Sequence, residues 1–177
     1  MATPPTFSVG ATLTAAQMNA VGLWLVKSQT VGTGVSSVTV TGAFSTDYDN
    51  YRIIYSGGVG SVTANLALRL GSATTSYYGF GVYGTFGSTA VLGINDNNAA
   101  RFGYVGGCDT SGATMIADLR MPFASVATYI SAPIDTGTSF GTYSGRYFPT
   151  TSFTDFTMFP DSGTITGGTI RVYGFRK

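Results

Sequence analysis

The chain of 177 residues contains no histidine and no glutamate, and its charged side chains are nine Lys or Arg and eight Asp. Without histidine there is no Ser-His-Asp or Cys-His nucleophile pair, no imidazole acid or base, and no His-ligated zinc or iron. The formal net charge of +1 gives no field that would hold a phosphate backbone, so we expect no nucleic-acid partner. The composition points away from most catalysis and predicts no cofactor.

The chain is also poor in cysteine and in long apolar runs. Its single cysteine, Cys108, cannot form an internal disulfide, and beside Asp109 we expect a buried or loop thiol rather than a reactive one. The longest apolar stretch, residues 21–26, is far shorter than the ~20 residues that span a bilayer. The first residues lack the basic start and apolar run of a secretory signal. We therefore expect no membrane insertion and no export by the usual route.

The residues that are abundant indicate a folded domain. Apolar residues make up 44% of the chain, aromatic residues make up 14%, and there are 25 glycines. Disordered chains are rich in charge and poor in aromatics, which is the reverse of this composition. The length favours one domain with a substantial core.

One helix is predicted near the amino end. Thr14 and Gln17 have the spacing of a capping box, good helix formers follow, and Gly22 is a plausible stop. The prediction is a helix of about two turns over residues 14–21, preceded by an extended arm that contains Pro4 and Pro5.

The rest of the chain has the period of β-strands. Leu66, Leu68 and Leu70 alternate with polar or small residues, as do the apolar residues of segment 115–121. Further strands are predicted at 23–26, 38–41, 51–55, 77–83, 101–105, 127–134, 153–159 and 169–175, which makes roughly ten. Turn clusters, among them 46–50 and 95–98, recur about every 10 residues. The pattern predicts an all-β antiparallel sandwich or barrel, and the strand number favours a jelly roll.

Two apparent ligand motifs have simpler interpretations. Gly79, Gly81 and Gly84 satisfy G-x-G-x-x-G, but the residues between them alternate as in a strand, so glycines that face bulky aromatics explain the motif better. The cluster of Asp47 and Asp49 lacks the loop spacing and closing Glu of a calcium site and is typical of a turn. We predict no metal site.

An enzyme that uses two carboxylates is still possible without histidine, because glycoside hydrolases need only such a pair. The candidates are Asp109, Asp118, Asp135, Asp155 and Asp161, and nothing in the sequence pairs them. Asp118 and Arg120 would share one face of a strand, where a solvated pair is the simpler interpretation. The chain is predicted not to be an enzyme.

The aromatic residues exceed what one face of each strand needs, so we expect some of them at the surface. Surface tyrosines serve subunit interfaces or sugar stacking, because the ring packs while the hydroxyl stays solvated. This supports an alternative function, a carbohydrate-binding module in which Tyr77, Tyr78 and Tyr83 stack on a host glycan.

Three segments carry a resemblance to a known group of proteins. Residues 4–19 (PPTFSVGATLTAAQMN) resemble the opening of many tailed-bacteriophage virion proteins. Residues 43–54 (AFSTDYDNYRII) resemble a strand-turn-strand of phage tail-fibre, head-fibre and related appendage modules, and residues 168–175 (GTIRVYGF) resemble their last strand. These pieces are structural and identify a kind of virion part rather than an activity.

The resemblance implies a jelly-roll-like sandwich at residues 27–177 and an amino-terminal arm and helix at 1–26 that docks to the particle. It implies a homo-oligomer, most often a trimer, located in the virion and in contact with other capsid, tail or fibre proteins, with exposed loops that can touch the host surface. The residues expected to anchor or oligomerise the chain are Pro4, Pro5, Phe7, Leu13, Met18 and Trp24. We expect a fibre component or capsid decoration.

Overall fold

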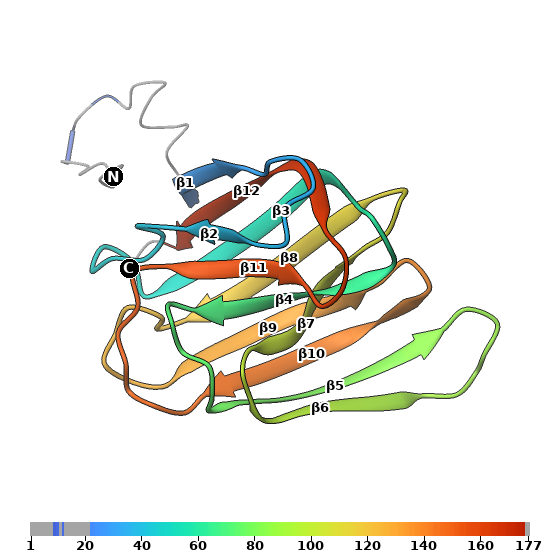
Figure 1. Ribbon diagram of the computed structural model, residues 1–177. Coiled ribbons are helices and arrows are strands. Elements are labelled where there is room, and N and C mark those ends of the chain that lie inside the picture. Colours follow the sequence, from blue (N-terminus) through green and yellow to red (C-terminus); the bar gives the residue numbers. More distant parts are fainter. Residues whose placement is uncertain (1–8, 11, 13–21, 176–177) are drawn as a thin grey trace.

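The computed structural model describes residues 9–10, 12 and 22–175, and all named strands in this part of the chain pair antiparallel (Figure 1). The strands are β1 (Leu23–Thr30), β2 (Val38–Val40), β3 (Asn50–Gly60), β4 (Ala64–Leu70), β5 (Tyr77–Thr85), β6 (Leu92–Ala99), β7 (Phe102–Cys108), β8 (Ala113–Arg120), β9 (Thr128–Asp135), β10 (Ser139–Tyr147), β11 (Phe156–Pro160) and β12 (Ile165–Phe175). The predicted all-β antiparallel class is confirmed.

The strands form two layers. The larger layer has the order β1-β12-β3-β8-β9-β10-β5-β6, and the smaller one has the order β2-β11-β4-β7. Figure 1 shows the smaller layer lying across one face of the larger. The two layers are joined where Gly106–Cys108 of β7 pair with Ala113–Met115 of β8. The arrangement is β-sandwich-like, with the core between the layers.

Alternation along the strands fills this core as the sequence predicts. Leu66, Leu68 and Leu70 of β4 are buried, while Asn65 and Arg69 are only partly buried. In the same way, Met115, Ala117 and Leu119 of β8 are buried and Ile116 is exposed. The prediction fails at Met121, because β8 ends at Arg120 and Met121 adopts φ 61 with its amide donating to the Asp49 carbonyl.

Two buried tyrosines fasten loops to the core. The Tyr51 hydroxyl accepts a hydrogen bond from the Ser45 amide (2.8 Å) and donates to the Ser45 carbonyl (3.0 Å). The Tyr77 hydroxyl accepts from the Leu70 amide (2.8 Å) and donates to the Leu70 carbonyl (3.4 Å). The Tyr51 hydroxyl thus bonds to both backbone groups of buried Ser45. The Leu70 carbonyl also accepts from the Ala73 amide (3.1 Å), so the main contribution of Tyr77 is to the Leu70 amide.

The G-x-G-x-x-G segment lies within β5, which confirms its structural interpretation. A Cβ on Gly79 would stand 2.1 Å from the Tyr143 hydroxyl, so the absence of a side chain lets that ring pack flat against β5. Gly81 serves the same purpose for Ile94 and Ile134.

Several predicted boundaries need correction. Strands β6 and β10 were not predicted, and the turn predicted at 95–98 is wrong because these residues lie in β6. The strand predicted from residue 153 begins only at Phe156. The domain boundary at residue 26 falls inside β1, which pairs with β12. The predicted helix at 14–21 lies outside the described residues.

The buried tyrosines give the fold a defined sensitivity to alkali. Burial raises the pKa of both Tyr77 and Tyr143, and a hydrogen bond to Asp96 raises that of Tyr143 further. In the unfolded chain these groups ionise near pH 10, whereas the folded chain keeps their protons. The unfolded state therefore binds fewer protons above about pH 10, and stability is lost as the pH rises.

We expect the free energy of unfolding, measured by urea titration, to be fully retained at pH 9 and to fall steadily above about pH 10. The variant Tyr143→Phe should be less stable at pH 8 but show a shallower decline with pH, because one titrating group is gone. If the stability of this variant fell with pH as steeply as that of the wild type, Tyr143 would not be one of the groups that cause the loss of stability in alkali.

Candidate binding cleft

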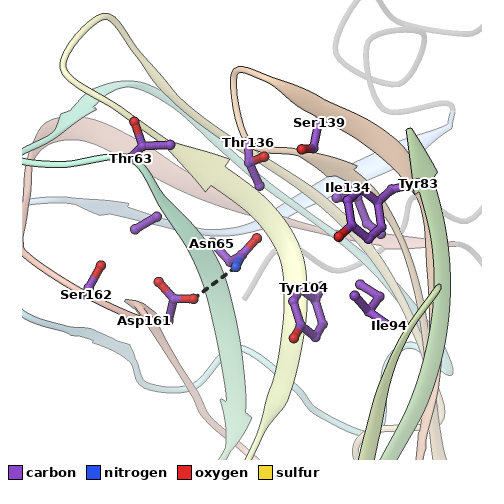
Figure 2. Close-up of a pocket in the computed structure, with 11 residues that line it drawn as sticks. Thr63, Asn65, Tyr83, Ile94, Tyr104, Ile134, Thr136, Ser139, Asp161 and Ser162 are labelled. Atoms are coloured by element: carbon purple, nitrogen blue, oxygen red, sulfur yellow. Dashed lines mark hydrogen bonds between the residues drawn. The ribbon is translucent and has the colours of Figure 1, made fainter. Parts of the chain in front are cut away.

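A cleft of about 470 Å³ opens between the two layers at one end of the molecule. Its walls come from β4, β5, β6, β7, β9 and the start of β10, and from the loops that precede β4 and follow β9 and β11 (Figure 2). The lining residues are Thr63, Ala64, Asn65, Tyr83, Ile94, Tyr104, Ile134, Thr136, Ser139, Asp161 and Ser162. The size is typical of pockets that hold small ligands.

One wall of the cleft is polar and fixed in place. The Asn65 side-chain amide donates to Asp161 Oδ2 (2.9 Å), and the Asp161 backbone amide donates to the Asn65 carbonyl (2.9 Å). Figure 2 shows this pair on the same side as Thr63 and Ser162. The carboxylate is thus held by its neighbour while its other oxygen has no partner among the described residues.

The opposite wall is aromatic and aliphatic. Figure 2 shows Tyr83, Ile94 and Ile134 of the larger layer across the cleft from Asn65 and Asp161, with the Tyr104 ring of β7 between the two sides. Burial, and then the nearby charges of Asp96 and Asp161, raise the pKa of Tyr104, so its hydroxyl stays protonated as a hydrogen-bond donor.

A hydrogen-bonded carboxylate supports the aromatic wall from behind. Asp96 Oδ2 accepts from the Tyr143 hydroxyl (2.6 Å) and from the Gly103 amide (2.9 Å), and the Tyr143 ring lies 5.9 Å from the Tyr104 ring. These bonds tie β6 to β7 and β10 and limit the movement of the wall.

A second hollow of about 390 Å³ lies near the β7–β8 turn and is lined by Cys108, Asp109 and Asp135 among others. Asp109 Oδ1 accepts hydrogen bonds from the Ser111 amide and hydroxyl and from the Gly112 amide, and these bonds lower its pKa. A carboxyl that is held ionised in this way is poorly suited to donate a proton. Cys108 is buried, as predicted, and burial raises the pKa of its thiol.

Two further acids, Asp118 and Asp47, have structural partners. Asp118 forms a two-point ion pair with Arg52 on the adjacent strand β3, with both N–O distances 2.7 Å. The predicted pairing of Asp118 with Arg120 is wrong, because Arg52 lies directly opposite Asp118 in the sheet register. Asp47 accepts from the Ser45 hydroxyl (3.1 Å) in a turn. Within the described residues, no three Cys or Asp side chains gather as metal ligands.

The three tyrosines predicted to bind a glycan lie in three different places. Tyr77 is fully buried between Phe102 and Tyr147, so its ring offers no face to a ligand and that prediction is wrong. Tyr78 is exposed on the outer face of the larger layer, where its ring meets Phe148 edge to face. Tyr83 lies in the cleft.

Of the cleft residues, the sequence indicated Tyr83 as a glycan residue and Asp161 as a candidate acid. It gave no sign of Asn65 or Tyr104 as their neighbours. The alternation of side chains along a strand could have separated the three tyrosines. It places Tyr78 on the opposite face of β5 from Tyr77 and Tyr83, so the three cannot form one site.

The residues predicted to anchor the chain lie almost wholly beyond the described part. Pro4, Pro5, Phe7, Leu13 and Met18 fall outside it. Trp24 lies in β1 opposite Gly174, and its ring packs against the core. Trp24 therefore belongs to the larger layer rather than to an arm.

Among the described residues we find no helical segment that could cross a lipid bilayer. No family model matches the chain, and a search of curated proteins finds no relative.

Proposed function

We propose that the chain is a non-enzymatic structural subunit of a tailed-bacteriophage virion, with a jelly-roll-like domain that assembles as a homotrimer in a fibre or capsid decoration. The resemblance of its amino-terminal, 43–54 and 168–175 segments to virion appendage proteins supports the location. The lack of histidine and glutamate supports a role without catalysis.

The observation that carries the assembly proposal is the outer face of the larger layer, which the smaller layer does not cover (Figure 1). Phe80 is 61% exposed on this face. Other large apolar side chains exposed there are Val82, Ile116, Tyr129, Phe140 and Phe148. A tract of this kind is typical of a surface that another protein covers.

The charges on this face favour a cyclic trimer over a two-fold dimer. The guanidinium of Arg146 lies 4.1 Å from the centre of the Phe148 ring, and that of Arg120 lies 5.8 Å from the centre of the Tyr129 ring. Neither arginine has an ion-pair partner among the described residues, whereas Asp118 is neutralised by Arg52. A two-fold contact would set arginines against arginines, while a cyclic contact sets this face against a different surface of the neighbour.

Attachment to the particle is assigned to the residues before β1. The pairing of Leu23 and Trp24 with β12 makes residues 23–26 part of the domain, so the attachment segment of the proposal ends at residue 21 or 22.

The assembly is tested by sedimentation velocity of the full chain at micromolar concentration, where we expect a trimer. Phe80→Arg removes the most exposed ring of the tract and adds a third unpaired cation to Arg120 and Arg146, so it should give a monomer. Val91→Arg changes an exposed side chain in the β5–β6 connection and should leave the trimer intact. A chain that begins at residue 22 should still assemble but should be missing from virions seen by electron microscopy.

A wild-type monomer at these concentrations would contradict the oligomer, and a dimer would contradict the charge argument. Normal occupancy of virions by the chain that begins at residue 22 would contradict attachment through the amino-terminal segment.

A further inference from the structure

The cleft between the layers has two chemically different walls that face each other. Tyr83 of the larger layer presents aromatic surface on one side, Asn65 and Asp161 present polar groups on the other, and the Tyr104 ring of β7 lies between them (Figure 2). Thr63, Thr136, Ser139 and Ser162 add hydroxyl groups around the opening. A ligand that fits both walls must have an apolar face and a rim of hydrogen-bonding groups.

We propose that this cleft binds a neutral sugar ring of an oligosaccharide. A pyranose has C–H groups on its faces, which pack on tyrosine rings, and hydroxyls on its rim, which both donate and accept hydrogen bonds. Asp161 accepts from such hydroxyls, and charge-assisted bonds of this kind are stronger than neutral ones. This inference goes beyond the assembly proposal and does not depend on it.

The site is organised before any ligand arrives. Asp161 is fixed by its two hydrogen bonds with Asn65, at 2.9 Å each. On the other wall, the Tyr143–Asp96 bond of 2.6 Å and the close approach of Ile94 and Ile134 to Gly81 hold the strands behind the rings. Because these side chains are already ordered, binding loses little conformational entropy.

The charge of the lining selects against other ligands. No Lys or Arg lines the cleft, and Asp161 is its single charged lining residue. An acidic sugar or a phosphate would place its charge near Asp161 and, behind the wall, near Asp96, so anionic ligands are disfavoured. A calcium ion needs six to eight oxygen ligands, which one lining carboxylate does not provide.

The experiment measures binding of the full chain to an array of neutral and acidic oligosaccharides, followed by isothermal titration calorimetry with the strongest neutral ligand. We expect neutral oligosaccharides to bind. Tyr83→Ala and Asp161→Ala should each lower the affinity at least about tenfold. Tyr83→Phe keeps the ring and should retain most of the affinity, because the proposal assigns the contact to the ring face rather than to the hydroxyl. Thermal melting of each variant checks the fold directly.

Tyr78→Ala is the matched control, because Tyr78 lies on the same strand but on the outer face. It should leave the affinity unchanged. The proposal is overturned if no neutral oligosaccharide binds, if only acidic ones bind, or if Tyr78→Ala abolishes binding while Tyr83→Ala does not. Sedimentation of the same samples reports assembly separately, so failure of either proposal can be told from failure of the other.

Discussion

Replacement of Gly107 by alanine is expected to destabilise the fold by about 3 kcal/mol, because the new methyl group has no space. A Cβ at this position of β7 would stand 1.9 Å from the Asp135 carbonyl oxygen and 2.5 Å from the Thr136 Cα. Both are backbone atoms, which cannot turn aside as a flexible side chain can. Relief would require β7 to move away from the end of β9, and this would loosen the contact between the two layers.

The measurement is the free energy of unfolding from a denaturant titration, with Gly112→Ala as the matched control. Gly112 lies in the turn that follows β7, and a Cβ there would meet nothing within 4 Å. We expect a change of less than about 0.5 kcal/mol for this control. Equal effects of the two substitutions would contradict the close approach of β7 to β9.

Replacement of Tyr77 should separate the contribution of its ring from that of its hydroxyl. Tyr77→Ala removes a fully buried ring that packs 4.8 Å from Phe102 and 4.9 Å from Tyr147, centre to centre, and should cost about 3–5 kcal/mol. Tyr77→Phe keeps the ring but leaves the Leu70 amide without its partner at 2.8 Å, and should cost about 1–3 kcal/mol.

Both free energies are measured by denaturant titration, and Tyr78→Ala is again the control. Tyr78 lies next to Tyr77 in the chain, but its side chain is exposed and its ring packs edge to face on Phe148. Its loss should cost less than about 1.5 kcal/mol. If Tyr77→Ala lowered the free energy of unfolding no more than Tyr78→Ala does, Tyr77 could not be fully buried. The prediction that Tyr77 binds a glycan would then stand again.

The sequence predicted the fold class because the alternation of buried and exposed residues is local. In β4 and β8, each inward side chain is apolar, so a period of 2 can be read without knowing the partner strand. Strand β10 does not have this signal, since Gly141 and Gly145 take two of its inward positions and its outer face mixes Phe140 with polar residues. Its glycines are explained only by close neighbours, such as the Val82 carbonyl, 2.0 Å from a Cβ built on Gly141.

Strand β6 was missed for a similar reason. Its Asn95 and Asp96 are typical turn residues, but tertiary contacts hold them in an extended strand, with Asp96 bonded to Tyr143 and Gly103. The cleft was beyond prediction because its residues come from separate strands and loops. Tyr83 and Asp161 were singled out individually, but only the sheet order brings them to one cleft.

The place of β12 in the sheet has a consequence for how the protein is made. Residues 165–175 lie between β1 and β3, with β1 formed by residues near the start of the described chain. During synthesis, β1 and the adjacent edge of β3 must wait without hydrogen-bonded neighbours until residues 165–175 have left the ribosome. Pairings of such long sequence separation form slowly. The exposed strand edges of a nascent chain are prone to join other chains, so this protein should depend on chaperones during translation more than its modest size suggests.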